Sequence, residues 1–214
     1  MIQMKSSYLI EELDKLYPDA RCELNYTKDY ELLIATVLSA QCTDKRVNSV
    51  TSILFSKYDI NALSKANLKD IERIIRSCGS YTKKAYYLKS IAERLISDYN
   101  GKVPNNREYL ESLPGVGRKT CNVVLSNLYD VPAIAVDTHV SRVAIRLGLA
   151  SKDDSVLTIE KKLMKKLPKK NWSRLHHQLV LFGRYNCKAI KPNCKECPFI
   201  EYCKEKNKNC IFIK

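Results

Sequence analysis

The amino-acid sequence predicts an all-α protein. Apolar residues recur at the spacing of one helix face along most of the chain, as in Leu88, Ile91, Ala92 and Leu95. Only residues 132–136 (PAIAV) resemble a strand, and no second strand candidate is available to pair with them, so we expect a covered loop there. A chain of 214 residues is long enough to bury a core, either as one domain or as two small lobes.

The expected helices follow one another closely. Residues 6–16 predict an amphipathic helix that ends at Tyr17 and Pro18, because proline does not continue a helix. Residues 30–40 are apolar on every side, which predicts a helix buried in the centre of a bundle. Asp44 is a candidate N-cap for the helix that follows it. Further helices are expected at residues 46–58, 65–77, 88–99, 106–111, 118–128, 137–147, 155–167 and 172–185.

The charge of the chain indicates a polyanionic partner. Lys+Arg 37 against Asp+Glu 23 gives a formal net charge of +14, which favours nucleic acid or an anionic membrane surface. No stretch approaches the apolar length of a membrane span, and the N-terminus lacks the apolar region of a signal peptide. We therefore expect a cytoplasmic protein that binds nucleic acid and does not enter a membrane.

The run LPGVGRKT, from Leu113 to Thr120, joins two of the predicted helices by a turn. Gly115 and Gly117 can adopt positive φ and have no Cβ, so backbone amides there can approach a bulky partner closely. The N-terminus of the second helix favours a phosphate through its unpaired N–H groups and its dipole. An ordinary connector between helices has the same features, so the turn alone does not decide between the two interpretations.

Two side chains could carry chemistry. Lys119 lies in the first turn of the second helix, where the positive end of the dipole disfavours an ammonium, and a nucleophile must be a neutral amine. A surface lysine that binds phosphate is an equally good interpretation of the motif alone. Asp137 begins a later helix and is explained by N-capping; it could also accept the proton of Lys119, and the two roles are compatible.

Nine cysteines are present, and four of them are crowded into one short segment. Cys187, Cys194, Cys197 and Cys203 have the spacing C-x6-C-x2-C-x5-C, whereas Cys210 lies outside the pattern and is not assigned as a ligand. Four thiolates packed this densely bind tetrahedral zinc or an iron–sulfur cluster. Zinc ribbons usually contain two C-x2-C pairs and this segment contains one, but the spacing alone leaves zinc as a rival.

Together, the run LPGVGRKT, the run VDTH at residues 136–139 and the cysteine spacing resemble the endonuclease III family of DNA glycosylases. The resemblance extends over nearly the whole chain. It implies a two-lobed helix–hairpin–helix fold, with a six-helix barrel domain at residues 22–131 and an iron–sulfur domain formed by residues 1–21 and 132–214. It also implies that the four cysteines hold a [4Fe–4S] cluster, and not zinc.

The resemblance further implies an activity in base excision repair. Lys119 would attack the sugar C1′ of a damaged nucleotide, assisted by Asp137, and β-elimination through a Schiff base would cut the strand 3′ to the site. The expected substrates are oxidised pyrimidines in double-stranded DNA, and a monomer associated with the nucleoid is expected. The alternatives are a mismatch-specific (thymine–guanine) glycosylase and a non-catalytic helix–hairpin–helix DNA-binding protein.

The resemblance also implies two residues that enter the DNA, in addition to candidates for phosphate contact that follow from the residues themselves. Gln41 would enter the duplex where the damaged nucleotide has left. In the family, a bulky apolar residue wedges into the opposite strand; here Ser80 stands where leucine is expected, so either Tyr81 takes over the wedge or the wedge is weak. The remaining candidates for DNA contact are Gly115, Gly117, His139, Lys188 and Lys191.

Overall fold

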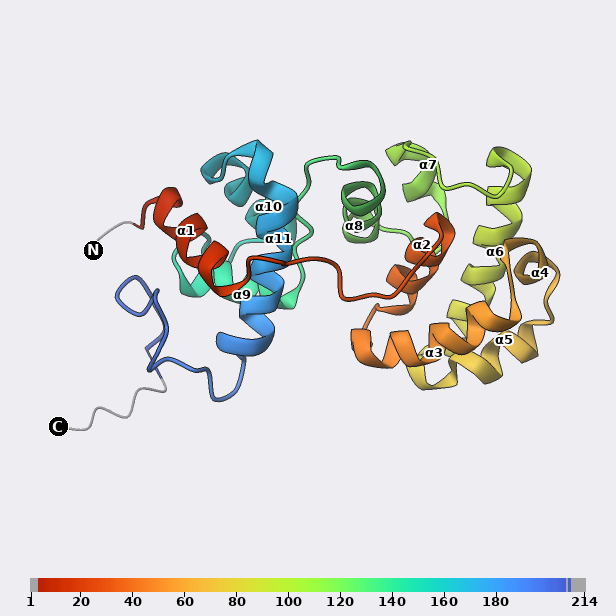
Figure 1. Cartoon of the computed structure of the whole chain (residues 1–214), viewed down its shortest axis with the longest axis horizontal. Coiled ribbons are helices and arrows are strands. Elements are labelled where there is room, and N and C mark those ends of the chain that lie inside the picture. Colours follow the sequence, from red (N-terminus) through yellow and green to blue (C-terminus); the bar gives the residue numbers. More distant parts are fainter. Residues whose placement is uncertain (1–3, 207, 209–214) are drawn as a thin grey trace. The chain divides into compact units, whose positions relative to one another are not determined.

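The computed structural model of the chain describes residues 4–206 and 208 (Figure 1). Its α-helices are α1 (Ser6–Leu16), α2 (Asp29–Leu38), α3 (Asp44–Lys57), α4 (Ile60–Lys65), α5 (Leu68–Ile75), α6 (Tyr81–Tyr99), α7 (Arg107–Ser112), α8 (Arg118–Tyr129), α9 (Thr138–Arg146), α10 (Val156–Lys166) and α11 (Trp172–Leu181). The shorter elements are the 3-10 helices η1 (Arg76–Cys78) and η2 (Lys169–Asn171) and the π-helix η3 (Phe182–Asn186). No strand occurs within the described residues, so the all-α prediction is confirmed. None of the described helices is long and apolar enough to span a membrane.

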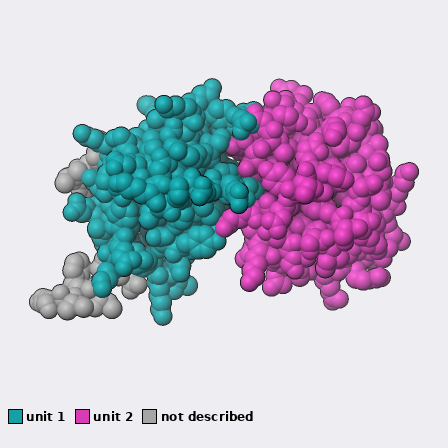
Figure 2. Space-filling model, in the orientation of Figure 1, with its two compact units in different colours: residues 1–22, 130–214 teal, residues 23–129 magenta. Residues whose placement is uncertain are grey.

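The chain divides into two compact units, which are coloured separately in Figure 2. Unit 2 is the continuous stretch 23–129. Unit 1 combines residues 1–22 with residues 130–214, of which 4–22, 130–206 and 208 are described. Because α1 belongs to unit 1, the chain leaves this unit once and returns to it once.

Helix α2 is the centre of unit 2. Every residue from Tyr30 to Leu38 is buried, and the helix packs against α3, α6 and α8. Such a helix is stable only where neighbours cover all of its sides, and the prediction of a central buried helix is confirmed. The start of α2 is fixed by Glu31, whose carboxylate accepts the backbone N–H groups of Thr27 (2.7 Å) and Lys28 (3.1 Å).

Helix α6 packs against α4 and α5 in the same unit. It ends where the sequence predicts, because Asn100 and Gly101 both have positive φ (51° and 79°). The N–H of Gly101 donates to the carbonyl of Leu95 (2.8 Å), which satisfies a carbonyl of the last turn. Asparagine and glycine are the residues that adopt this conformation at lowest cost.

Unit 1 has a hydrophobic core of its own. The core contains residues of α1, α9, α10 and α11 together with buried residues of the loop 133–136, which is a covered loop as predicted. Phe182 and Phe199 are fully buried, and their rings meet edge to face with centroids 5.2 Å apart. Tyr8 of α1 makes a second edge contact with Phe199 at 6.2 Å. Aromatic packing therefore anchors the chain near the cysteines to this core.

Several details of the predicted helices are wrong. Helix α4 (Ile60–Lys65) was not predicted, and α6 begins at Tyr81 and not at residue 88. Thr43, and not Asp44, caps α3, since its hydroxyl accepts the N–H of Arg46 (3.4 Å). Thr and Asp are both good N-cap residues, so two neighbouring candidates cannot be separated by type alone. The last helix is not regular to residue 185, because α11 ends at Leu181 and continues as the wider π-helix η3.

Candidate active site

The predicted turn in unit 2 joins α7 to α8 as a tight hairpin. The N–H of Val116 donates to the carbonyl of Leu113 (3.1 Å), and both side chains are buried. Gly115 has a φ of 78°, and a Cβ at this position would lie 2.5 Å from the ring of Tyr87. Backbone conformation and packing therefore both exclude a side chain at residue 115.

Gly117 differs from Gly115, because no neighbouring atom excludes a side chain there. A Cβ at this position would meet nothing within 4 Å, so the space in front of the backbone is open. The carbonyl of Gly117 accepts the first helical hydrogen bond of α8, from the N–H of Cys121 (2.9 Å). The amides of the first helical turn have no partner within their own helix, and open space in front of them suits an anionic group.

Lys119 is the second residue of α8, and its side chain is exposed. The helix beneath it is fixed, because the residues from Cys121 to Ser126 are buried and α8 packs against α2 and α7. Arg107 of α7 adds a polar link by donating to the Oδ1 of Asn122 (2.7 Å). The hairpin therefore presents an exposed amine on a well-packed helix.

Asp137 is the N-cap of α9 in unit 1. Its Oδ1 accepts the backbone N–H groups of His139 (2.8 Å) and Val140 (2.9 Å). The two bonds fix the carboxylate, so the capping interpretation holds and gives the group a defined position. Lys119 belongs to unit 2, and the pairing of the two side chains stays a prediction.

Gln41 lies in a turn of unit 2, and Tyr81 directly follows another turn, at Gly79 and Ser80, which the structure brings close to the first. Gln41 follows α2 and is exposed, and Tyr81 is the first residue of α6. The ammonium of Lys84 donates to the carbonyl of Ala40 (2.8 Å), in the first turn, and to the carbonyl of Cys78 (2.7 Å), directly before the second. Our sequence analysis missed Lys84, because a lysine at one position of an amphipathic helix gives no sign that it is buried.

Arg142 and Arg146 connect α9 to the start of the cysteine segment. Arg142 donates to the carbonyls of Gly183 (2.7 Å) and Cys187 (3.0 Å), and burial lowers the pKa of its guanidinium. Arg146 donates to the carbonyl of Lys188 (2.7 Å) and to the Sγ of Cys187 (3.4 Å). Sequence reasoning missed both arginines, since their i, i+4 spacing is that of any solvated helix face.

The other predicted DNA contacts of unit 1 are accessible to different degrees. His139 is partly buried, with its Nδ1 3.2 Å from Arg142, and a Cβ at Gly183 would lie 2.8 Å from its Cβ. Lys188 and Lys191 are both exposed, and Lys191 has a φ of 50°. Their contacts with DNA stay predictions.

The four cysteines follow η3 in one segment of unit 1. The thiols of Cys187, Cys194, Cys197 and Cys203 form no disulfide among the described residues, and Cys210 lies outside them. The pKa of the Cys197 thiol is raised to about 11, mainly by burial and to a lesser extent by the three neighbouring thiols. Among residues 4–206 and 208, no three His, Cys, Asp or Glu side chains are arranged as a metal-binding group. The donor set itself, four neighbouring sulfurs, suits zinc or an iron–sulfur cluster.

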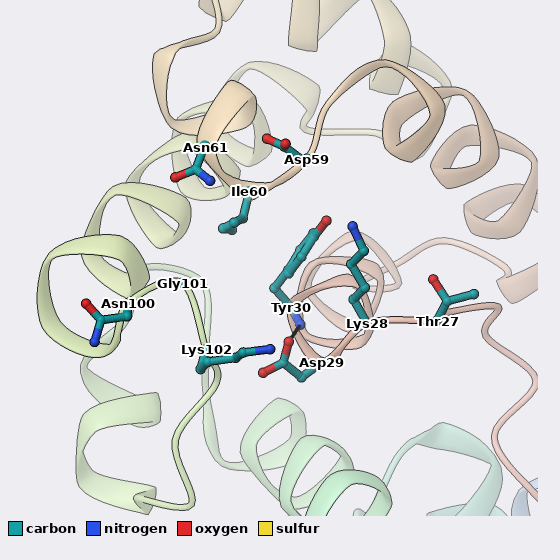
Figure 3. Close-up of a pocket in the computed structure, with 10 residues that line it drawn as sticks. All are labelled: Thr27, Lys28, Asp29, Tyr30, Asp59, Ile60, Asn61, Asn100, Gly101 and Lys102. Atoms are coloured by element: carbon teal, nitrogen blue, oxygen red, sulfur yellow. Dashed lines mark hydrogen bonds between the residues drawn. The ribbon is translucent and has the colours of Figure 1, made fainter.

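A pocket of about 600 Å³ lies elsewhere in unit 2, at the start of α2 (Figure 3). The Asp29 carboxylate accepts the backbone N–H groups of Val103 (2.8 Å) and Tyr30 (2.9 Å), and the Lys28 ammonium lies 5.7 Å from the centre of the Tyr30 ring. None of the predicted site residues lines this pocket, so it is separate from the candidate active site. Its lining residues are Thr27, Lys28, Asp29, Tyr30, Asp59, Ile60, Asn61, Asn100, Gly101 and Lys102.

Comparison with known proteins identifies the class to which this hairpin and fold belong. The family model described as "HhH-GPD superfamily base excision DNA repair protein" matches residues 34–169, more than half of the chain. The chain therefore belongs to the HhH-GPD superfamily of base excision DNA repair proteins.

Individual relatives narrow the assignment. Endonuclease III of Bacillus subtilis (strain 168) is 47% identical over 213 residues, which cover 97% of this chain and 96% of that protein. Endonuclease III of Escherichia coli (strain K12) is 39% identical over 209 residues, covering 97% and 99%. The chain belongs to the endonuclease III family, whose members are DNA glycosylases with abasic-site lyase activity, and the predicted resemblance is confirmed.

Solved structures agree with this assignment. A trapped endonuclease III–DNA covalent intermediate with an estranged adenine is 52% identical and covers 93% of this chain and 94% of its own, with a TM-score of 0.89. A non-covalent endonuclease III–DNA complex has the same identity and coverage and a TM-score of 0.90. A thermostable thymine-DNA glycosylase, with a TM-score of 0.78 and 24% identity, shares the fold.

Proposed function

We propose that this chain excises oxidised pyrimidines from double-stranded DNA and cuts the strand through a Schiff base on Lys119. The observation that carries the proposal is the exposed amine of Lys119 at the start of α8, beside the open backbone at Gly117. The trapped covalent intermediate of the 52% identical endonuclease III supports a covalent step in this family. The proposal therefore assigns to Lys119 the bond with the sugar.

The reaction proceeds in two stages. The Nζ of Lys119 bonds to the sugar C1′, and the base leaves with the electron pair of the glycosidic bond. The bond from C1′ to the ring oxygen then breaks, the oxygen takes a proton, and a protonated C=N bond remains between the sugar and Lys119. Loss of a proton from C2′ expels the 3′ phosphate from C3′, which cuts the strand. Water then releases the lysine from the cleaved sugar.

Asp137 has two tasks in this scheme. Its carboxylate accepts the proton that the amine of Lys119 loses on attack. It also stabilises the positive charge that develops on the sugar as the base departs. Both tasks require a fixed carboxylate, and the two backbone hydrogen bonds to its Oδ1 supply that.

The chemistry requires a nucleotide that has left the base stack. Gln41 occupies the space that the nucleotide leaves, and Tyr81 inserts beside the opposite strand in place of an apolar wedge. Gln41 lies in a turn of unit 2, and Tyr81 directly follows another. Damaged pairs open at the lowest cost, which favours their selection.

Backbone contacts hold the duplex during this step. The amides at Gly115 and Gly117 and the side chains of His139, Lys188 and Lys191 bind phosphates. The formal net charge of +14 attracts the duplex from a distance. We propose a monomer that works on the nucleoid in the cytoplasm.

The ligands that we propose for a [4Fe–4S] cluster are Cys187, Cys194, Cys197 and Cys203. The support is a set of four neighbouring thiols in one segment of a family member. When bound, the cluster crosslinks a polar segment that has little hydrophobic core. The cluster would also fix the position of Lys188, which lies in this segment and contacts a phosphate. The purified protein should be brown and should contain iron and sulfide, which chemical analysis measures. A colourless protein with one zinc would overturn the assignment.

Borohydride added during turnover tests the central assignment. The full chain should become covalently attached to DNA that carries an oxidised pyrimidine. Lys119→Ala should lower trapping and strand cleavage by about a thousandfold or more, since the nucleophile is gone. Lys161→Ala, which removes an exposed lysine of α10, is the control and should trap like the unaltered chain. Undiminished trapping by Lys119→Ala would refute the proposal.

The same assay on a panel of duplexes separates the alternatives. Excision of thymine opposite guanine, with oxidised pyrimidines left intact, would assign the chain as a mismatch-specific glycosylase. Binding without excision and without cleavage of an abasic duplex would assign it as a non-catalytic DNA-binding protein.

A further inference from the structure

The turn that contains Gln41 and the turn directly before Tyr81 both have strained backbones. Gln41 has a φ of 57° and Ser80, directly before Tyr81, has a φ of 44°. A residue other than glycine in this region costs about 1–2 kcal/mol, and such conformations persist only where surrounding contacts fix them. Some feature of unit 2 must therefore hold both turns.

That feature is the ammonium group of Lys84 in the first turns of α6. It donates hydrogen bonds to the carbonyls of Leu38 (2.9 Å), Ala40 (2.8 Å) and Cys78 (2.7 Å), which use the three donors of an ammonium. Leu38 ends α2 and Cys78 ends η1, so the cation lies where two helices present carbonyls without helical partners. One side chain thereby links the turn that contains Gln41 to the end of η1, directly before the second turn.

Burial of the Lys84 ammonium costs free energy that a residue with a packing role alone would not need to spend. Lys84 is 6% exposed, and burial lowers the pKa of its ammonium. Its three hydrogen-bond partners are all backbone carbonyls, which compensate the charge less than a carboxylate would. A methionine would fill the same volume without that cost. The charge is therefore explained by the carbonyls that it holds.

We propose that Lys84 is a positioning residue for the opening of DNA. It sets the separation and direction of Gln41 and Tyr81, so that both side chains enter the duplex as one rigid unit. The inference rests on the proposed function for the roles of those two residues. Lys84 itself does not touch DNA in this scheme.

Hydrogen exchange on the full chain tests the link directly. Lys84→Met should speed amide exchange at residues 40–42 and 79–81 together, by about tenfold or more, because both turns lose a hydrogen-bonded anchor. Lys89→Met is the matched control, since Lys89 is on the same helix and donates to the carbonyl of Ala66 (3.1 Å), which lies in neither turn. Faster exchange in one turn only, or in neither, would overturn the proposal. If Lys84→Met does not fold, Lys84→Gln, which keeps an NH2 donor, takes its place in the same comparison.

Activity gives a second, separable readout. Lys84→Met should lower excision of an oxidised pyrimidine from duplex DNA by about tenfold, while borohydride trapping on an abasic site in single-stranded DNA stays within about twofold. A merely destabilised protein would lose both activities equally, and that outcome counts against positioning. If the unaltered chain shows no activity at all, the proposed function fails, and the exchange measurement still decides whether Lys84 couples the two turns.

Discussion

The hairpin of unit 2 (residues 113–118) and the cysteine segment of unit 1 (residues 187–203) are held in different ways. The hairpin is fixed by its backbone and by close packing, with Gly115 against the ring of Tyr87. The cysteine segment contains no regular helix, and its order comes from turns, from the buried ring of Phe199 and from arginine side chains of α9. The hairpin therefore depends on close packing, whereas the cysteine segment depends on a few side-chain contacts and on the cluster that we propose for it.

Loss of the proposed cluster should separate the two regions most strongly. Cys197→Ser removes one proposed ligand, and a structural metal site can contribute about 10 kcal/mol to folding. We expect hydrogen-exchange protection to disappear across residues 187–203 and to persist in the hairpin. Cys22→Ser, which removes a thiol outside the pattern, serves as the control. Equal loss of protection in both regions would show that they do not depend on different forces.

A methyl group in the hairpin should give the next largest effect. Gly115→Ala places a Cβ 2.5 Å from Tyr87 at a positive φ, and we expect a loss of about 2–4 kcal/mol in unfolding free energy. Gly117→Ala, where a Cβ meets nothing within 4 Å, should cost less than about 1 kcal/mol. Urea denaturation measures both, and Gly115→Ala combined with Tyr87→Ala should recover part of the loss. Similar values for the two glycines would contradict the packing argument.

Removal of an arginine anchor should loosen only the cysteine segment. Arg146→Met loses its hydrogen bonds to the carbonyl of Lys188 (2.7 Å) and to the carboxylate of Glu205 (3.0 Å), at a cost of about 1–3 kcal/mol. Exchange should quicken around residue 188 and stay constant in the hairpin. The control is Arg73→Met, because the ion pair of Arg73 with Asp70 is exposed and contributes little. Faster exchange in the hairpin would contradict the inference that the two regions are held by separate contacts.

The effect that is smallest at neutral pH concerns acid, and it should arise in unit 1. Burial and, to a lesser extent, the charge of Arg184 lower the pKa of His177 from 6.5 to about 4. Between these values the unfolded chain binds a proton that the folded chain does not, so stability is complete above pH 6.5 and falls as the pH drops towards 4. His177→Gln should flatten this part of the curve of unfolding free energy against pH. An unchanged slope would show that other groups cause the acid sensitivity.

Local patterns account for what could be predicted. A few neighbouring residues suffice to predict three features of the fold: the apolar run of α2, the helix end at Asn100 and Gly101, and the hairpin glycines. Lys84 could not be found in this way, because its role depends on carbonyls up to 46 positions away in the sequence. The N-cap of α3 was assigned to Asp44 because Thr43 and Asp44 are adjacent and both are good capping residues.

The roles proposed for the cysteines and for Lys119 rest on resemblance and not on periodicity. Spacing alone left zinc open for the cysteines, and a phosphate-binding lysine open for the hairpin. Arg142 and Arg146 were missed for the reason that hid Lys84: charged residues on a helix look alike until their partners are known. Local sequence therefore predicts elements better than it predicts the contacts between them.

The π-helix at Phe182–Asn186 constrains how this chain can vary in length. A π-turn accommodates one residue more than an α-turn, so a deletion within it would restore a regular helix. Each residue of an α-helix turns the chain by about 100°, so the deletion would swing Cys187 to another side of the helix axis. Arg142 and Arg146 of α9 would then lose their hydrogen bonds to the carbonyls of Cys187 and Lys188. Length is consequently as tightly specified here as residue identity.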